Sequence, residues 1–142
     1  MTTIEGFTFN NCTSLESINL GNNLSTIETY AFKGCNSLKY IDLGDGIVEL
    51  GNQCFRDCSN LETIKVEAKL TSIGASAFYG CNNLLDFYCY ASTPPTIDTS
   101  YGSPSFSSTS DKTTLHIPIR SYSKYTSSKW RDYFKVIIDD ID

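Results

Sequence analysis

Six cysteines are the residues of this chain with the most obvious capacity for chemistry. Four of them recur at equal intervals, namely Cys12, Cys35, Cys58 and Cys81. Stacked turns would bring such a column within the Cα separation of about 4.4–6.8 Å that a disulfide requires, but side chains pointing the same way suit the S–S dihedral poorly. Zinc is disfavoured because this spacing is not a C-x-x-C pattern and the chain has one histidine. We therefore predict that the column consists of small buried hydrophobic residues.

Cys54 and Cys58 form a C-x-x-x-C sequence, which is a weak metal signal. Cys54 occupies a position where two of the other repeats have alanine, Ala31 and Ala77. Since alanine at that position indicates a tightly packed site, we predict that Cys54 is also a core residue.

His116 is the only histidine, between Leu115 and Ile117 on a predicted strand. Its side chain should face the opposite way from theirs. It is either a catalytic base or metal ligand, or an ordinary surface histidine, and the second interpretation is favoured because no Cys, Asp or Glu motif is placed around it. Asp139 and Asp140 are interpreted as a solvated tail. Without a G-x-S-x-G, H-E-x-x-H or P-loop motif, the sequence predicts no enzyme, no metal site and no cofactor.

These residues belong to a repeat of constant length that runs without gaps. The stretch from Ile73 to Leu84 aligns with residues 50–61, 27–38 and 4–15. A fixed period of this length indicates a solenoid, in which apolar positions of successive turns stack into columns that share one core. Two such columns are Ile4, Ile27, Leu50 and Ile73, and the aromatic set Phe9, Phe32, Phe55 and Phe78.

Each repeat contains one segment that favours a strand. The L-x-x-I-x-L segment, as in Leu15 to Leu20, ends in period-2 alternation with β-branched residues. The A-F-x-G-C segment, as in Ala31 to Cys35, is too short for a full helix and forms one helical turn or an irregular bend. We expect an α/β-type repeat solenoid with 23-residue turns, one parallel sheet of short strands about 4.8 Å apart, short helical or irregular turns opposite, and a C-terminal cap.

The pattern changes after residue 95. Residues 1–95 hold four repeats, then Pro94 and Pro95 interrupt the register and Ile97 lies one residue later than the period predicts. Residues 96–142 are rich in Ser and Thr but keep apolar and aromatic residues, so we predict a degenerate fifth repeat and a C-terminal cap within one continuous domain. The expected elements are strands at 115–118 and 136–138 and an amphipathic helix at 121–134. Three tail tyrosines form a second site or pack the cap: Tyr101, Tyr122 and Tyr125.

Composition excludes several classes of partner. The 142 residues carry a net charge of −5, which argues against nucleic acid and against a polybasic membrane contact. No apolar run approaches the roughly 20 residues of a membrane span, so we predict no direct membrane insertion. No signal peptide follows Met1, and we expect the sequence to be a piece of a longer chain whose leader is absent.

The repeat pattern I-x-x-x-A-F-x-G-C-x-S-L-x-x-I-x-L, at residues 27–43, resembles the BspA-type leucine-rich repeat. The tail is similar to the C-terminal end of such proteins from gut and oral bacteria, with A-S-T-P-P at 91–95, L-H-I-P at 115–118 and three spaced aromatics, Tyr125, Trp130 and Phe134. The chain departs from the pattern at Cys54, Phe87 and Cys89, where apolarity is kept. The resemblance implies a secreted or surface-exposed bacterial protein, and some relatives are adhesins for host proteins or other bacteria.

The outward positions of the predicted strands are the best candidates for a binding site, because solenoids bind through such a face. They form two columns: Ser17, Tyr40, Thr63 and Asp86, and Asn19, Asp42, Lys65 and Tyr88. Tyrosine favours interfaces since it offers a large ring and a polar tip. We predict an interaction or adhesion module that binds a host or bacterial surface protein or a glycan. The alternative is a structural spacer or capping segment with no ligand of its own, whose strand face is simply wetted.

Overall fold

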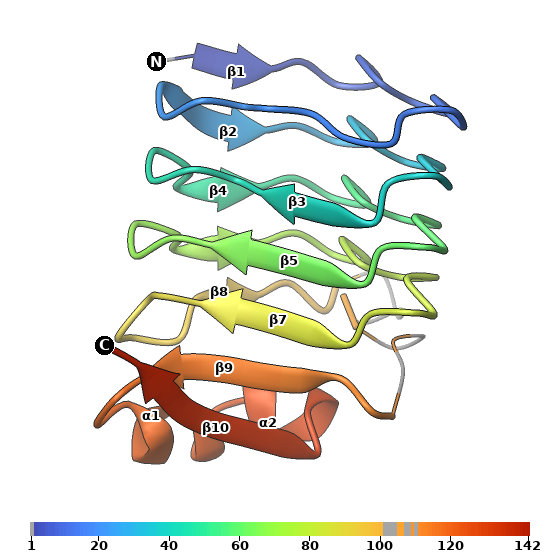
Figure 1. The fold of residues 1–142 in the computed structure, drawn as a ribbon. Helices are drawn as coiled ribbons and strands as arrows, with labels where there is room; N and C mark the ends of the chain where they lie inside the picture. The colour runs from blue at the N-terminus through green and yellow to red at the C-terminus, as the bar shows by residue number, and fades with distance from the viewer. Residues whose placement is uncertain (1, 101–104, 107–108, 110) are drawn as a thin grey trace.

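The chain winds into stacked turns that carry two parallel sheets (Figure 1). The computed structural model describes residues 2–100, 105–106, 109 and 111–142. The first sheet has the strand order β1-β2-β4-β6-β8, so each turn adds one strand beside the strand of the turn before. Its strands are β1 (Thr2–Ile4), β2 (Leu24–Ile27), β4 (Glu49–Leu50), β6 (Ser72–Ile73) and β8 (Thr96–Ile97).

The second sheet is built in the same way on the opposite side of the core, in the order β10-β9-β7-β5-β3. Its strands are β3 (Tyr40–Asp42), β5 (Thr63–Val66), β7 (Asp86–Cys89), β9 (Thr114–Pro118) and β10 (Val136–Ile141). Figure 1 shows the two sheets running in opposite directions, joined on one side by long irregular turns.

The predicted solenoid with a parallel sheet of short strands is confirmed, and the second sheet is the one expected from the L-x-x-I-x-L segments. Two details differ. The first sheet was not predicted, because several of its strands are two residues long, too short to show the alternation of apolar and polar residues that indicates a strand. The strand expected at residues 15–20 is absent, since this segment is the outermost one on its side, with exposed Ser17 and Asn19.

The A-F-x-G-C segments are irregular bends rather than helical turns, and hydrogen bonds between successive turns hold them. The Phe9 amide donates to the Ala31 carbonyl at 2.8 Å, and the Phe32 amide donates to the Cys54 carbonyl at 2.8 Å. Backbone groups that a helix would satisfy within itself are therefore satisfied by the next turn.

The phenylalanine column runs through the whole core. Its ring centroids are 5.0 Å apart for Phe9 and Phe32, 5.2 Å for Phe32 and Phe55, and 5.6 Å for Phe55 and Phe78. Phe106 extends the column into the Ser-rich segment, with its ring 5.2 Å from that of Phe78. A ring thus continues the phenylalanine column beyond the four regular repeats.

All six cysteines are free, and five of them are buried, while Cys12 is half-buried. The predicted core role is confirmed, with one addition. The thiols of Cys35, Cys58 and Cys81 donate hydrogen bonds to the carbonyl oxygens of phenylalanines in the preceding turn, at 3.2, 3.1 and 3.2 Å. Burial raises the pKa of Cys81 to about 12, so its thiol remains a neutral donor.

The C-terminal cap contains two short helices, α1 (Tyr122–Thr126) and α2 (Trp130–Tyr133), where one amphipathic helix was predicted. The hydroxyls of Ser127 and Ser128 bond back to backbone carbonyls at 2.7 Å, which offers the chain an alternative to a continuous helix. The predicted strands at 115–118 and 136–138 are present, and β10 continues to Ile141. Asp139 and Asp140 are exposed, as predicted, but they lie in a strand and not in a tail.

Trp130 and Tyr125 anchor this cap on the last repeats. The Trp130 indole donates to the Pro95 carbonyl at 2.8 Å, and the Tyr125 hydroxyl donates to the Ala91 carbonyl at 2.6 Å. Both side chains are buried, so Tyr125 packs the cap. Tyr122 remains 46% exposed, and Tyr101 lies outside the described residues.

Candidate binding face of the second sheet

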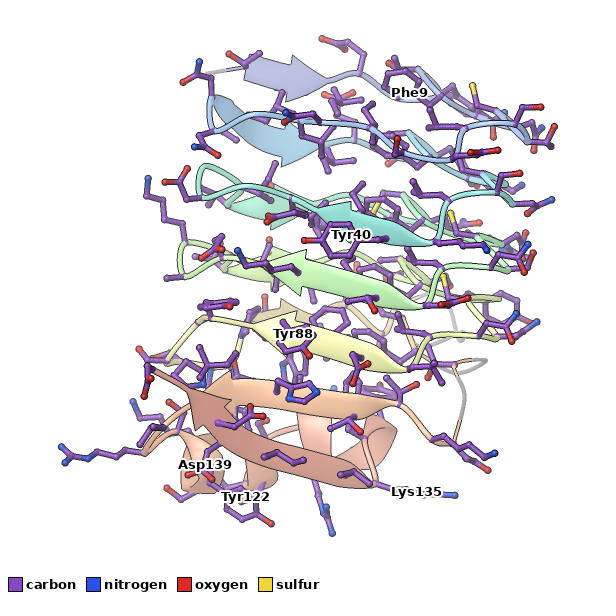
Figure 2. The ribbon with its side chains drawn as sticks, in the orientation of Figure 1. Phe9, Tyr40, Tyr88, Tyr122, Lys135 and Asp139 are labelled. Atoms are coloured by element: carbon purple, nitrogen blue, oxygen red, sulfur yellow. The ribbon has the colours of Figure 1, made fainter. Side chains whose placement is uncertain are left out.

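The structure brings six of the eight predicted face residues together on β3, β5 and β7. In the parallel register Tyr40 pairs with Thr63 and Thr63 with Asp86, while Asp42 pairs with Lys65 and Lys65 with Tyr88. Figure 2 shows Tyr40 and Tyr88 on the outer side of this sheet. The other two residues, Ser17 and Asn19, are exposed in the preceding turn and belong to no strand.

Lys65 is the centre of one polar group on this face. Its ammonium lies 3.2 Å from Asp42 and 2.7 Å from Glu67, and 5.1 Å from the centre of the Tyr90 ring. The hydrogen bond to Glu67 raises the pKa of Lys65, with a smaller contribution from Asp42. The charge is therefore held in one place among two carboxylates and an aromatic ring.

Two of the predicted face residues have a local structural role. The Asn19 side-chain oxygen accepts a hydrogen bond from the Gly21 amide at 2.9 Å, and Asp42 accepts one from the Gly44 amide at 2.9 Å. Both glycines have positive φ. These side chains stabilise the turn that follows, so Asn19 needs no ligand to explain it.

His116 lies between two carboxylates, and the prediction of an ordinary surface histidine is wrong. Its Nε2 atom is 3.0 Å from Asp86 on β7, and its Nδ1 atom is 2.9 Å from Asp140 on β10. The ring stacks on Tyr88 with centroids 4.2 Å apart. The side chain is 12% exposed. An imidazolium ring donates to both carboxylates, whereas a neutral ring donates to one.

Sequence reasoning missed this cluster because its members are far apart along the chain. Asp86 is 30 residues before His116 and Asp140 is 24 residues after it. The neighbouring strands β7, β9 and β10 place them side by side. The one signal in the sequence was the alternation of β9, which predicts that His116 faces outward. The sequence did not show how β7 and β10 are aligned beside β9, so the two aspartates could not be placed.

The two carboxylates fix the orientation of the His116 ring. Both ring nitrogens of His116 are already engaged by carboxylates, so neither is open to take a proton from a substrate. Across the part of the chain that the structure describes, no group of His, Cys, Asp and Glu is arranged to hold a metal ion. Burial raises the pKa of Tyr88, and the charges of Asp86 and Asp140 raise it further, so its phenol stays a neutral donor.

A hollow of about 410 Å³ lies on the outer side of the first sheet, lined in part by Glu49, Ser72 and Thr96. Its glycines have a packing explanation. A Cβ at Gly51 would lie 2.7 Å from the backbone of the preceding turn, and one at Gly74 would lie 2.5 Å from it. The close approach of successive turns requires glycine at these positions, so we assign no ligand to this hollow.

Comparison with known proteins identifies the repeat. The model of the BspA type leucine rich repeat region, with six copies, matches residues 2–129. The chain belongs to this family. A comparison with curated proteins finds no match. A leucine-rich repeat protein from Bacteroides ovatus, known from a crystal structure, is similar over 81% of this chain with 30% identity and a TM-score of 0.65.

Membership of the BspA-type family places the chain among repeat modules that serve in interactions or as structural units and are generally non-enzymatic. Members are typically extracellular or associated with a surface. The chain spans about 28% of the length of the Bacteroides ovatus protein. Among the described residues there is no helix with the length and apolarity needed to cross a membrane.

Proposed function

We propose that this chain is a surface-exposed or secreted interaction module, of the adhesion type, which binds a protein or a glycan through the outer face of the second sheet. The observation that carries the proposal is the ordered polar network on that face. Lys65 and His116 each bridge two carboxylates. Side chains already held in one geometry lose less conformational entropy when a ligand binds.

The chemistry of the face suits a host or bacterial surface protein or a glycan. Tyr40 is 53% exposed and offers an aromatic ring with a polar tip. The four carboxylates of Asp42, Glu67, Asp86 and Asp140 outnumber the basic side chains among them, Lys65 and His116, so the face offers acceptors for ammonium groups or sugar hydroxyls. The same balance of charge opposes binding of nucleic acid.

A structural spacer or capping segment is the second candidate. The turn-stabilising contacts of Asn19 and Asp42 favour it, because they give face residues a role that needs no ligand. Under this hypothesis the polar network only stabilises the sheet, and the chain serves to hold another region of a larger protein in position.

A binding screen separates the two candidates. The purified chain is immobilised and tested against surface proteins and a glycan array, and each ligand found is titrated against Tyr40→Ala, Lys65→Ala and Tyr88→Ala. We expect affinity losses of about tenfold or more, since interface tyrosines and charged residues often contribute that much. Tyr122→Ala and Lys69→Ala, exposed residues outside the face, serve as matched controls. Absence of any ligand, or face variants that bind like the controls, would support the spacer instead.

A further inference from the structure

A second surface of the molecule gathers aromatic and cationic side chains at the irregular turns that lead from the first sheet to the second. These turns form the right-hand edge of Figure 1. We call this surface the turn ladder. It consists of Phe7, Tyr30, Lys33, Gln53, Arg56 and Tyr79.

The upper part of the turn ladder is a pair of rings with a cation. The Phe7 and Tyr30 centroids are 4.9 Å apart, and the Lys33 ammonium lies 5.3 Å from the Tyr30 ring centre. The Tyr30 hydroxyl accepts a hydrogen bond from the Gln53 amide of the next turn at 3.0 Å. The contact therefore passes directly from one turn to the next.

The lower part continues the same line. The Arg56 guanidinium donates to the side-chain amide oxygen of Gln53 at 2.8 Å and lies 4.8 Å from the Tyr79 ring centre. It also pairs with Asp57 at 3.4 Å. From Phe7 to Tyr79 the side chains thus form an unbroken contact along four successive turns.

The backbone at this position lies in the left-handed region in every turn, since Ser76, the equivalent buried residue of the fourth turn, also has a φ of 55°. Phe7, Tyr30 and Gln53 have φ angles of 64°, 60° and 55°, in the left-handed region that bulky side chains avoid. Phe7 is nevertheless 59% exposed, so folding gains little from its ring. The positive φ therefore belongs to the turn itself, and the feature peculiar to the first turn is the exposed ring of Phe7.

We propose that the turn ladder binds an extended acidic polysaccharide that lies along the axis of the solenoid. Aromatic rings accept the apolar C–H faces of sugars. Rings lie on three of the four turns, as Phe7, Tyr30 and Tyr79, and contacts through Gln53 and Arg56 join them in one line, which suits an extended ligand. This site is independent of the second-sheet face and of its proposed ligand.

The cations of the turn ladder select an acidic ligand. Within the described residues Lys33 has no carboxylate partner, and its charge lies over the Tyr30 ring. Arg56 engages two atoms of its guanidinium and retains further N–H groups for a carboxylate. Salt at physiological strength screens charges beyond about 8 Å, so the net charge of −5 elsewhere on the chain does not prevent a local contact.

Affinity electrophoresis of the intact chain through gels that contain polygalacturonate tests the proposal, with a neutral β-glucan and polyglutamate as comparison polymers. We expect retardation by polygalacturonate, weaker retardation by the β-glucan, and none by polyglutamate. Arg56→Ala and Tyr30→Ala should each weaken the interaction by about tenfold, because the first removes a charge-assisted contact and the second removes a ring. Lys33→Ala should reduce the preference for the acidic polymer.

Phe7→Gly separates binding from stability. Glycine relieves the positive φ, so the variant should unfold at the same temperature as the wild type or above it, yet bind polygalacturonate less tightly. Lys69→Ala and Tyr122→Ala should bind normally. Equal retardation by both polysaccharides, no retardation by either, or a preference for polyglutamate would overturn the proposal, and the last result would assign the turn ladder to an acidic protein. Because none of these readouts uses the second-sheet face, they leave the test of that face unaffected.

Discussion

The first and the last described turns bury the same apolar columns to different depths. In the first turn Phe9, Cys12, Leu15, Ile18 and Leu20 are packed against the core but only partly buried. In the last turn Phe106 is 3% exposed and Leu115 is fully buried. Figure 1 shows the reason, since α1 and α2 lie beside the last strands, while β1 has a neighbour on one side.

This contrast shows that the repeat pattern specifies which side chains face inward, whereas the depth of burial depends on the neighbouring turns. The Phe32 ring is packed between the rings of Phe9 and Phe55 and is fully buried, whereas the Phe9 ring stacks on Phe32 only. Stability in such an array is approximately a sum of turn and interface contributions. The same substitution should therefore have a cost that depends on its turn.

Removing the anchor of the cap should have the largest effect. Trp130→Ala deletes a buried ring that contacts Phe87 at 5.7 Å and a hydrogen bond to Pro95. We expect a loss of unfolding free energy near the upper end of about 3–5 kcal/mol. Chemical denaturation measures it, and Trp130→Phe should recover most of the loss. A change below about 1 kcal/mol, far under that range, would show that the cap does not close the core.

Within the phenylalanine column, position should decide the cost. Phe55→Ala should destabilise by about 3–5 kcal/mol because the ring is packed between two others. Phe9→Ala should cost about 1–2 kcal/mol, since the ring is partly exposed. Urea titrations of the two variants under identical conditions give the difference. Equal costs would contradict the contrast between the ends.

Removing a polar side chain of the second sheet should also cost different amounts of unfolding free energy in different turns, but both costs should be smaller. His116→Gln removes the imidazole that links Asp86 on β7 to Asp140 on β10 across the intervening strand β9. We expect a loss of about 1 kcal/mol, because both carboxylates are partly exposed. Lys65→Met, in the middle of the sheet, should cost about 0–1 kcal/mol. If Lys65→Met proved the more damaging in thermal unfolding, the cap would not depend on His116.

The reactivity of the cysteine thiols should differ between the first turn and the later turns in the same way as their burial does. The half-buried Cys12 should react with iodoacetamide in the native state. Burial raises the pKa of Cys81 to about 12 and of Cys89 to about 11, so at pH 9 both remain protonated and unreactive until the chain unfolds. Mass spectrometry of the alkylated peptides identifies the sites, and Cys12→Ser should abolish the native-state reaction. Native labelling of Cys81 at the rate of Cys12 would contradict this difference in burial.

Most of the fold could be predicted from the sequence because its signal is periodic. The column of Phe32, Phe55 and Phe78 depends on a pattern that one repeat shares with the next, and the strand at residues 115–118 depends on local alternation. For the same reason the outward positions of β3, β5 and β7 could be named in advance, although Ser17 and Asn19 lie on no strand. The side of the sheet follows from alternation along each strand.

The features that escaped prediction depend on geometry between segments that share no pattern. The interval from Phe78 to Phe106 is longer than one repeat, and so is the interval from Ile73 to its strand partner Ile97. In this part of the chain the period no longer tells which residues are neighbours. His116 therefore lacked visible partners. The thiol hydrogen bonds were equally hidden, because backbone carbonyls leave no trace in the residue types of a repeat.

The uniform register has a consequence for how genes of this kind change length. Leu50 pairs with Ile27 on one side and with Ile73 on the other, each one repeat away along the chain. Unequal crossing-over between two repeats adds or deletes one whole repeat at a time, and either event leaves all columns in phase. The cap contacts the last repeats through Ala91 and Pro95, so it remains in place when a turn is lost or gained upstream. One terminal segment can thus close solenoids of many different lengths.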